Sequence, residues 1–252
     1  MADANKKELL DAIGAANQAY ESFAIISVVK AHLVESKLMV RDRDTLYPRA
    51  VEAEWLDTAV SLARDLLSSG NNTTLTDFTT SDGEHIKIAI EAIRPKARVV
   101  IFGGGHVGHA LATMSMLAGY GVLVIDDREA FASRERLPDT RIDLLVAPFP
   151  EAARNVQITT NTAIVIVTRG HQHDEICLKA VANSNARYIG MIGSRRRVIS
   201  VFKKLVENGI PQAKLDRVHA PIGLRIGARS PQEIAVAILG EIIQTFNSPP
   251  AA

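Results

Sequence analysis

The chain has 252 residues, 47% of them hydrophobic, and a formal net charge of +1 when its seven histidines are neutral. A chain of this length and composition can bury one large core or two modest ones, which excludes intrinsic disorder. The near-zero net charge provides no bulk attraction to nucleic acid or to an anionic membrane surface, so neither is an expected partner.

The amino-terminal segment predicts an amphipathic helix over residues 6–20, because apolar residues recur there at helical spacing among charged ones. It contains no uninterrupted apolar stretch, which excludes a secretory signal and a membrane span. The single cysteine, Cys177, cannot form an intrachain disulfide and fits a reducing compartment; we interpret it as a buried, unreactive thiol. These features favour a soluble cytoplasmic protein.

Residues 1–95 predict a small α+β domain. The expected elements are strands at 23–29 and 37–40, a helix at 54–67, and strands at 73–80 and 84–93. Ser81-Asp82-Gly83 is a hairpin signal between the last two strands, and Pro95 marks residues 94–97 as a linker. The hairpin and the helix carry more apolar residues than a small layer needs to cover, so we expect a homodimer that packs through them.

Residues 98–247 predict a larger domain in which strands alternate with helices. The expected strands are 98–102, 122–126, 142–146, 163–168 and 187–192, and the expected helices are 109–118, 174–182, 195–207 and 231–246. Such alternation is typical of a parallel sheet with helices on both faces. The predicted fold class is therefore α/β, a Rossmann-like doubly wound parallel sheet with a smaller N-terminal α+β domain. Ligands of such sheets bind at the carboxyl ends of the strands.

A G-x-G-x-x-G motif directly follows the first of these strands. It is formed by Gly103, Gly104, Gly105, His106, Val107 and Gly108. In the dinucleotide-binding fingerprint the first glycine permits a tight turn, the second lets the backbone approach a pyrophosphate, and the third lets the helix pack on the strand. The start of the following helix then offers unpaired N–H groups to the anion.

A carboxylate completes the fingerprint. Asp126 and Asp127 end the next strand about 20 residues after the first glycine, where an acid accepts hydrogen bonds from a ribose. Arg128 follows them and is included in the candidate binding site. In the alternative interpretation, Asp127 or Arg128 only caps the next segment.

A polar cluster follows the strand predicted at 163–168. It contains Thr168, Arg169, His171 and Asp174, and we expect it at the ligand edge of the sheet. The alternative is a simple helix start with solvated histidines and Asp174 near the N-cap. A metal site built from His106, His171 and His173 is conceivable, but nothing in their spacing marks one, so no metal is assigned.

A basic cluster follows the strand predicted at 187–192. Gly193 and Ser194 begin a helix whose first turn carries Arg195 and two further arginines. Positive side chains are unfavourable at a helix N-terminus unless an anion lies nearby, so the cluster favours phosphate recognition. The alternative is a solvated basic face with one arginine in a structural ion pair. We identify no catalytic residue in any of these clusters.

A Gly/Pro-containing loop occupies residues 220–229 and is either a lid over the pocket or a tight connection. Ser230-Pro231-Gln232-Glu233 follows it and predicts a helix N-cap with proline at the first helical position and a capping box.

Five segments of the chain resemble the xanthine dehydrogenase accessory protein family (XdhC/CoxI-type). They read FGGGHVGHAL, IDDREAFASRERLPD, TRGHQHDE, YIGMIGSRRR and HAPIGLRIGARSPQEIAVAILGEII, and occur in this order between Arg98 and about Gln244. The resemblance implies a protein that binds molybdenum cofactor (molybdopterin), shields it and delivers it. The implied partners are a molybdenum hydroxylase apoenzyme and a cysteine desulfurase that adds a sulfur to the cofactor.

The N-terminal half departs from the family pattern. Residues 29–37 replace a Gly-Ser-Ala-Pro-Arg stretch, and residues 49–54 replace a Gly-Gly-Cys-Leu-Glu stretch without its cysteine. Arg225 lies where the family has an aspartate, and Arg229 where it has a glutamate. Two other functions stay open: an NAD(P)-dependent oxidoreductase that uses the same crevice, with NAD(P) or another nucleotide as ligand, and an interaction protein that has lost its ligand.

Overall fold

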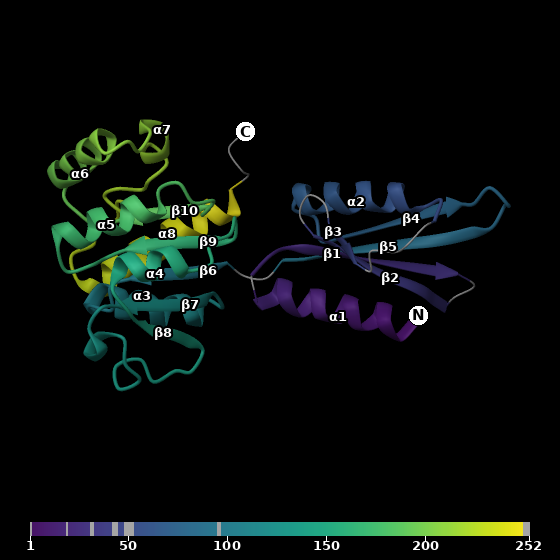
Figure 1. Cartoon of the computed structure of the whole chain (residues 1–252), viewed down its shortest axis with the longest axis horizontal. Coiled ribbons are helices and arrows are strands. Elements are labelled where there is room, and N and C mark those ends of the chain that lie inside the picture. The colour runs from purple at the N-terminus through teal and green to yellow at the C-terminus, as the bar shows by residue number, and fades with distance from the viewer. Residues whose placement is uncertain are drawn as a thin grey trace. The chain divides into compact units, whose positions relative to one another are not determined.

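The structure is a computed structural model that describes residues 2–18, 20–30, 33–41, 45–47, 53–94 and 97–248. Its contacts divide the chain into two units, Met1–Pro95 and Lys96–Ala252, which we describe separately (Figure 1). Of the predicted linker, Pro95 and Lys96 lie outside the described residues, as do residues 49–52 of the segment without its cysteine. None of the described helices is long and apolar enough to cross a membrane.

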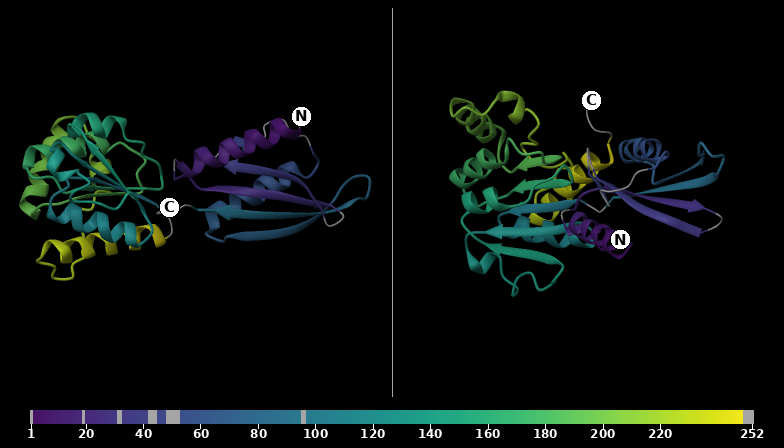
Figure 2. Two further views of the ribbon diagram at one scale, coloured as in Figure 1. Left: turned by 90° about the horizontal axis from the view of Figure 1, so that it is seen from below. Right: turned by 45° about the vertical axis from the view of Figure 1, so that its right-hand side comes forward.

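The N-terminal unit is an antiparallel sheet in the order β3-β2-β1-β5-β4. Its elements are α1 (Ala2–Gln18), β1 (Phe23–Lys30), β2 (Leu33–Arg41), β3 (Thr45–Tyr47), α2 (Leu56–Ser69), β4 (Thr73–Thr79) and β5 (His85–Ile93). Side chains alternate between the faces of a strand. Accordingly, Ile26 of β1 packs with α2, whereas Phe23 of the same strand packs with α1. The two helices lie on opposite faces of the sheet (Figure 2).

The sequence pattern predicted the positions of most of these elements, but it did not predict the full length of each one. The predicted strand at 37–40 is only part of β2, which begins at Leu33 because Leu33, Val34 and Ser36 also pair with β1. The short strand β3 was not predicted, since three residues carry no detectable alternation.

The C-terminal unit is a parallel sheet with the order β10-β9-β6-β7-β8. Its strands are β6 (Arg98–Phe102), β7 (Gly121–Asp126), β8 (Ile142–Val146), β9 (Thr162–Ile166) and β10 (Tyr188–Met191). Its helices are α3 (His106–Leu117), the 3-10 turn η1 (Glu129–Phe131), α4 (Phe149–Asn155), α5 (His171–Val181), α6 (Arg195–Glu207), α7 (Gln212–Leu215) and α8 (Pro231–Asn247). The strand order reverses between β6 and β9, as in a Rossmann half.

Helices cover both faces of this sheet. One core joins α4, α5 and α6 to Val100 and Phe102 of β6, and the other joins α3 and α8 to Val99 and Ile101 of the same strand. All four of these side chains are fully buried, which explains why β6 reads as a continuous apolar run. The predicted α/β fold class, with a smaller α+β part, is confirmed.

Two helices of this unit begin earlier in the structure than the sequence predicted. α3 begins at His106 and α5 at His171, each three residues earlier than predicted, because Gly105 and Gly170 occupy the N-cap positions and polar residues fill the first turns. Asp174 therefore lies inside the first turn of α5 and not at its N-cap. α4 and α7 were not predicted, since their short runs carry too few turns to show helical periodicity.

Candidate functional site

The loops after β6 and β9 meet at the switch in strand order. A Cβ atom added to Gly103, whose φ is +113°, would lie 2.5 Å from the carbonyl oxygen of Val167. The glycine turn and the segment that carries Thr168 and Arg169 are therefore packed against each other. This is the position at which open α/β sheets bind their ligands.

Close packing leaves no room for a side chain at most of the motif glycines, but it leaves room at one of them. A Cβ atom would lie 2.1 Å from the Phe131 carbonyl oxygen at Gly104 and 1.8 Å from the Gly103 carbonyl oxygen at Gly108. At Gly105, by contrast, a Cβ atom would meet nothing within 4 Å, and its φ of −65° suits any residue. Packing therefore explains Gly104 and Gly108, whereas Gly105 borders open space.

That open space adjoins the start of α3. Among the described residues, no side chain caps this helix at Gly105. The first N–H groups of a helix have no partner within it, so those of His106, Val107 and Gly108 are available to an external acceptor. The helix dipole adds a partial positive charge at the same point, which favours an anion.

Both carboxylate oxygens of Asp126 accept hydrogen bonds from other residues of the chain. Its side chain is fully buried, and its Oδ2 accepts from the Gly104 N–H at 2.9 Å and from Arg128 Nη2 at 3.1 Å. Its Oδ1 accepts from the Arg128 Nε at 2.9 Å and from the Arg128 backbone N–H at 3.1 Å. Burial acts to raise the pKa of Asp126, but these bonds outweigh it and hold that pKa below its ordinary value.

The loop after β7 folds back onto the glycine turn. The Arg128 guanidinium lies over the Phe131 ring, 3.6 Å from its centroid, and that of Arg136 lies 4.7 Å from the same centroid. His109 Nε2 of α3 is 2.7 Å from the Arg136 carbonyl oxygen. With the Phe131 carbonyl against Gly104, these contacts fix the loop on the start of α3.

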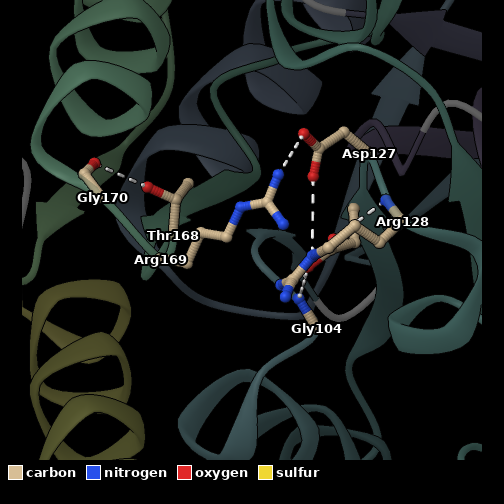
Figure 3. Close-up of polar contacts among 7 residues, drawn as sticks. Gly104, Asp127, Arg128, Thr168, Arg169 and Gly170 are labelled. Atoms are coloured by element: carbon tan, nitrogen blue, oxygen red, sulfur yellow. Dashed lines mark hydrogen bonds and ion pairs between the residues drawn. The ribbon is translucent and has the colours of Figure 1, made fainter.

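An ion pair joins the loops after β7 and β9 (Figure 3). Arg169 Nη2 lies 3.0 Å from Asp127 Oδ2, and the Arg128 Nε lies 3.7 Å from Asp127 Oδ1. The Arg169 side chain is about half exposed, at 46%, so this pair lies at the surface of the edge. Such a pair contributes little to stability, on the order of 0–1 kcal/mol, and an incoming anion can replace it.

A buried cluster ties α5 to α6. Asp174 is fully buried and accepts from the Thr168 hydroxyl and from Arg197 Nη2. Burial raises the pKa of Asp174, although both partners act to lower it. Ser194 caps α6 by accepting from the Arg197 N–H at 3.3 Å. One arginine of the basic cluster therefore forms a structural ion pair, as in the alternative interpretation of that segment.

The other two arginines of the cluster, Arg195 and Arg196, are exposed at the start of α6. His106 is also exposed, whereas nothing can be said of the His171 side chain, which lies outside the described side chains. Across the described residues, no group of three or more His, Cys, Asp or Glu side chains could hold a metal ion. Cys177 is buried, and burial together with nearby carboxylates raises the pKa of its thiol.

A third carboxylate, which is partly buried, anchors the Gly/Pro loop. Glu241 of α8 accepts from the Tyr188 hydroxyl at 2.6 Å and from the Gly223 N–H at 2.8 Å, and His219 Nδ1 lies 3.3 Å from it. Burial acts to raise the pKa of Glu241, but these bonds together lower it. The predicted capping box at Ser230 and Glu233 is confirmed at the start of α8.

The C-terminal unit matches a known protein family. Residues 99–242, more than half of the chain, match the family described as the XdhC Rossmann domain. The chain belongs to the XdhC family. The resemblance read from the five sequence segments is thereby confirmed.

Two relatives of this XdhC-family chain are named as a xanthine dehydrogenase subunit and as a molybdenum cofactor chaperone. It is 35% identical over 157 residues to a probable xanthine dehydrogenase subunit of Bacillus subtilis, covering 62% of this chain and 45% of that protein. It is 25% identical over 149 residues to the molybdenum cofactor insertion chaperone PaoD of Escherichia coli, covering 59% and 40% of the two chains. The chain thus spans less than half the length of these relatives.

A solved structure shares the fold of both units. It is a crystal structure of a xanthine dehydrogenase from Bacillus halodurans, with a TM-score of 0.66 and 23% sequence identity. The match covers 94% of this chain and 66% of the other.

Three residues that hold loops of the C-terminal unit in place escaped the sequence analysis: Phe131, Tyr188 and Glu241. Glu241 had a signal, because it is the only charged residue between Glu233 and the end of α8. A lone acid in so apolar a helix indicates a buried partner. Phe131 and Tyr188 carry no such signal, since isolated aromatic residues occur throughout protein cores.

Proposed function

We propose that this XdhC-family chain binds molybdenum cofactor at the carboxyl edge of its parallel sheet and delivers it to a molybdenum hydroxylase. Family membership and the name of the relative PaoD support a role in the maturation of molybdenum enzymes. The structural observation that carries the proposal is Gly105, which borders open space beside the uncapped start of α3. A phosphate of the cofactor would occupy that space and accept from the helix N–H groups.

We assign the remaining candidate residues to the same site. Thr168 and Arg169 lie in the loop after β9 and Asp127 and Arg128 in the loop after β7 (Figure 3), and Arg195 begins α6. We propose that Arg169 exchanges its surface pair with Asp127 for the anionic ligand. Because Asp126 and Asp174 are fully buried and are bonded to internal partners, we assign them to holding the loops in place.

An oxidoreductase is the weaker alternative. Such an enzyme needs a proton-transfer group next to the nicotinamide. The three aspartates described at this edge are either buried with internal partners, as Asp126 and Asp174 are, or joined in a surface ion pair, as Asp127 is. The geometry therefore favours binding and release over turnover.

The proposed partners are the hydroxylase apoenzyme, a cysteine desulfurase and a second copy of the chain. We propose that the second copy packs through the hairpin that carries Leu75 of β4, a side chain that is 65% exposed. A monomeric mass by light scattering at high protein concentration would count against the homodimer.

The test compares Gly105→Val with Gly14→Val. Both glycines have open space at the Cβ position, and only Gly105 lies at the proposed site. We expect both variants to fold and only Gly105→Val to lose the pterin that mass spectrometry detects in purified protein. Losing one N–H···phosphate bond, worth about 1.5–3 kcal/mol, lowers affinity by about 10-fold or more. Equal pterin retention by both variants, or none by the wild type, would overturn the proposal.

A further inference from the structure

Asp126 occupies the position of the acid that binds ribose in dinucleotide folds, but it has no capacity left for a ligand. An ionised carboxylate has about four acceptor positions on its two oxygens. Three are taken by Arg128, through Nε, Nη2 and the backbone N–H, and the fourth by the Gly104 N–H. A ribose hydroxyl could bind there only by displacing a donor that is already in place.

Arg128 is held firmly in that position. It forms a two-point ion pair with a fully buried carboxylate, which is the strongest geometry available to an arginine. Its other side lies against the Phe131 ring at 3.6 Å, and only 28% of its side chain is exposed. The guanidinium is therefore held in one position between Asp126 and the Phe131 ring.

The Arg128 side chain also lies beside Asp127. Within the described residues, Asp127 Oδ1 has no hydrogen-bond partner, yet the atom is buried and lies 3.7 Å from the Arg128 Nε. Its Oδ2 is paired with Arg169. Neither acid at the end of β7 can thus receive a ribose diol while Arg128 remains where it is.

We propose that Arg128 is a specificity-determining residue that closes the ribose subsite of this crevice. The crevice then takes a ligand whose phosphate reaches the start of α3 without a nucleoside ribose seated on Asp126, and it rejects adenine and nicotinamide nucleotides. This inference rests on the proposed function for the location of the ligand, and it adds the chemical class that the site selects.

The test uses NADH as the probe, in a titration that contains no molybdenum cofactor. Arg128→Met keeps an unbranched chain against Phe131 and removes the guanidinium. We expect it to bind NADH at least 10-fold more tightly than the wild type does. The double variant Arg128→Met with Asp126→Asn should lose most of that gain. NADPH, whose 2′-phosphate would meet Asp126, should gain less than NADH.

Each outcome decides the proposal. If the wild type binds NADH as tightly as Arg128→Met, or if folded Arg128→Met shows no gain, Arg128 does not close the subsite. Should Arg128→Met fail to fold, Arg128→Lys serves, because its single ammonium cannot reproduce the two-point pair and must then show a smaller gain of the same sign. Pterin retention is measured separately, so failure of the proposed function is recognised independently of this result.

Discussion

The hydroxyl group of Tyr188 offers a sharp test of how the Gly/Pro loop is anchored. Tyr188 is 1% exposed, its hydroxyl donates to Glu241 at 2.6 Å, and its ring stacks on His219 at 4.6 Å between centroids. Tyr188→Phe removes the donor and keeps the ring. A hydrogen bond to a charged group contributes about 1.5–3 kcal/mol, so we expect the free energy of unfolding to fall by that amount at pH 7.

The loss should depend on pH in a definite direction. Because the folded-state pKa of Glu241 is lowered, its contribution is present above the ordinary pKa of about 4.5 and is lost as the pH falls through the folded value. Tyr188 is one cause of that lowering, so the difference between Tyr188→Phe and the wild type should shrink as Glu241 becomes protonated. The double variant with Glu241→Gln should show a coupling energy of about 1 kcal/mol or more.

Urea denaturation followed by circular dichroism measures this effect. Trp55, the single tryptophan, lies in the N-terminal unit, so its fluorescence follows the unfolding of that unit separately. A loss below about 0.5 kcal/mol, or a loss that does not shrink as Glu241 is protonated at low pH, would refute the reasoning, because a hydrogen bond to a charged group cannot behave in that way.

Two further predictions concern the ends of helices. Ser230→Ala should lower stability by about 1 kcal/mol in the same denaturation experiment, because it removes the side chain that accepts from the Glu233 N–H in the capping box; an unchanged midpoint would contradict this. The double variant Arg195→Ala with Arg196→Ala should lower pterin retention without changing the unfolding curve, since both side chains are exposed at the start of α6; unaltered retention would remove these arginines from the site.

The sequence predicted the features that depend on local pattern. The apolar run of β6, the glycine motif after it and the Ser230 cap are each specified by neighbouring residues, and each was located correctly. Helix starts were less accurate, because the polar first turns of α3 and α5 resemble loops until the backbone is seen.

Long-range pairings could not be predicted in this way. Arg197 was visible as one of three equivalent arginines, but only the packing of α6 beside α5 selects it as the partner of Asp174. Likewise, the sequence presents Asp126 as a free ribose acceptor. Its closure depends on how the chain turns back after β7, so that Arg128 and Gly104 both reach it.

The central position of β6 also constrains the order in which the C-terminal unit can form. One edge of β6 pairs with β7, which is the next strand in the chain. The other edge pairs with β9, which comes much later in the chain and whose Thr162 lies opposite Arg98. Until β9 has been synthesised and docked, the apolar run from Val99 to Phe102 keeps an unpaired edge. Non-local pairing of this kind is slow, and the exposed edge is prone to association with other chains. We therefore expect the ligand edge, which needs both loops, to be completed late in folding.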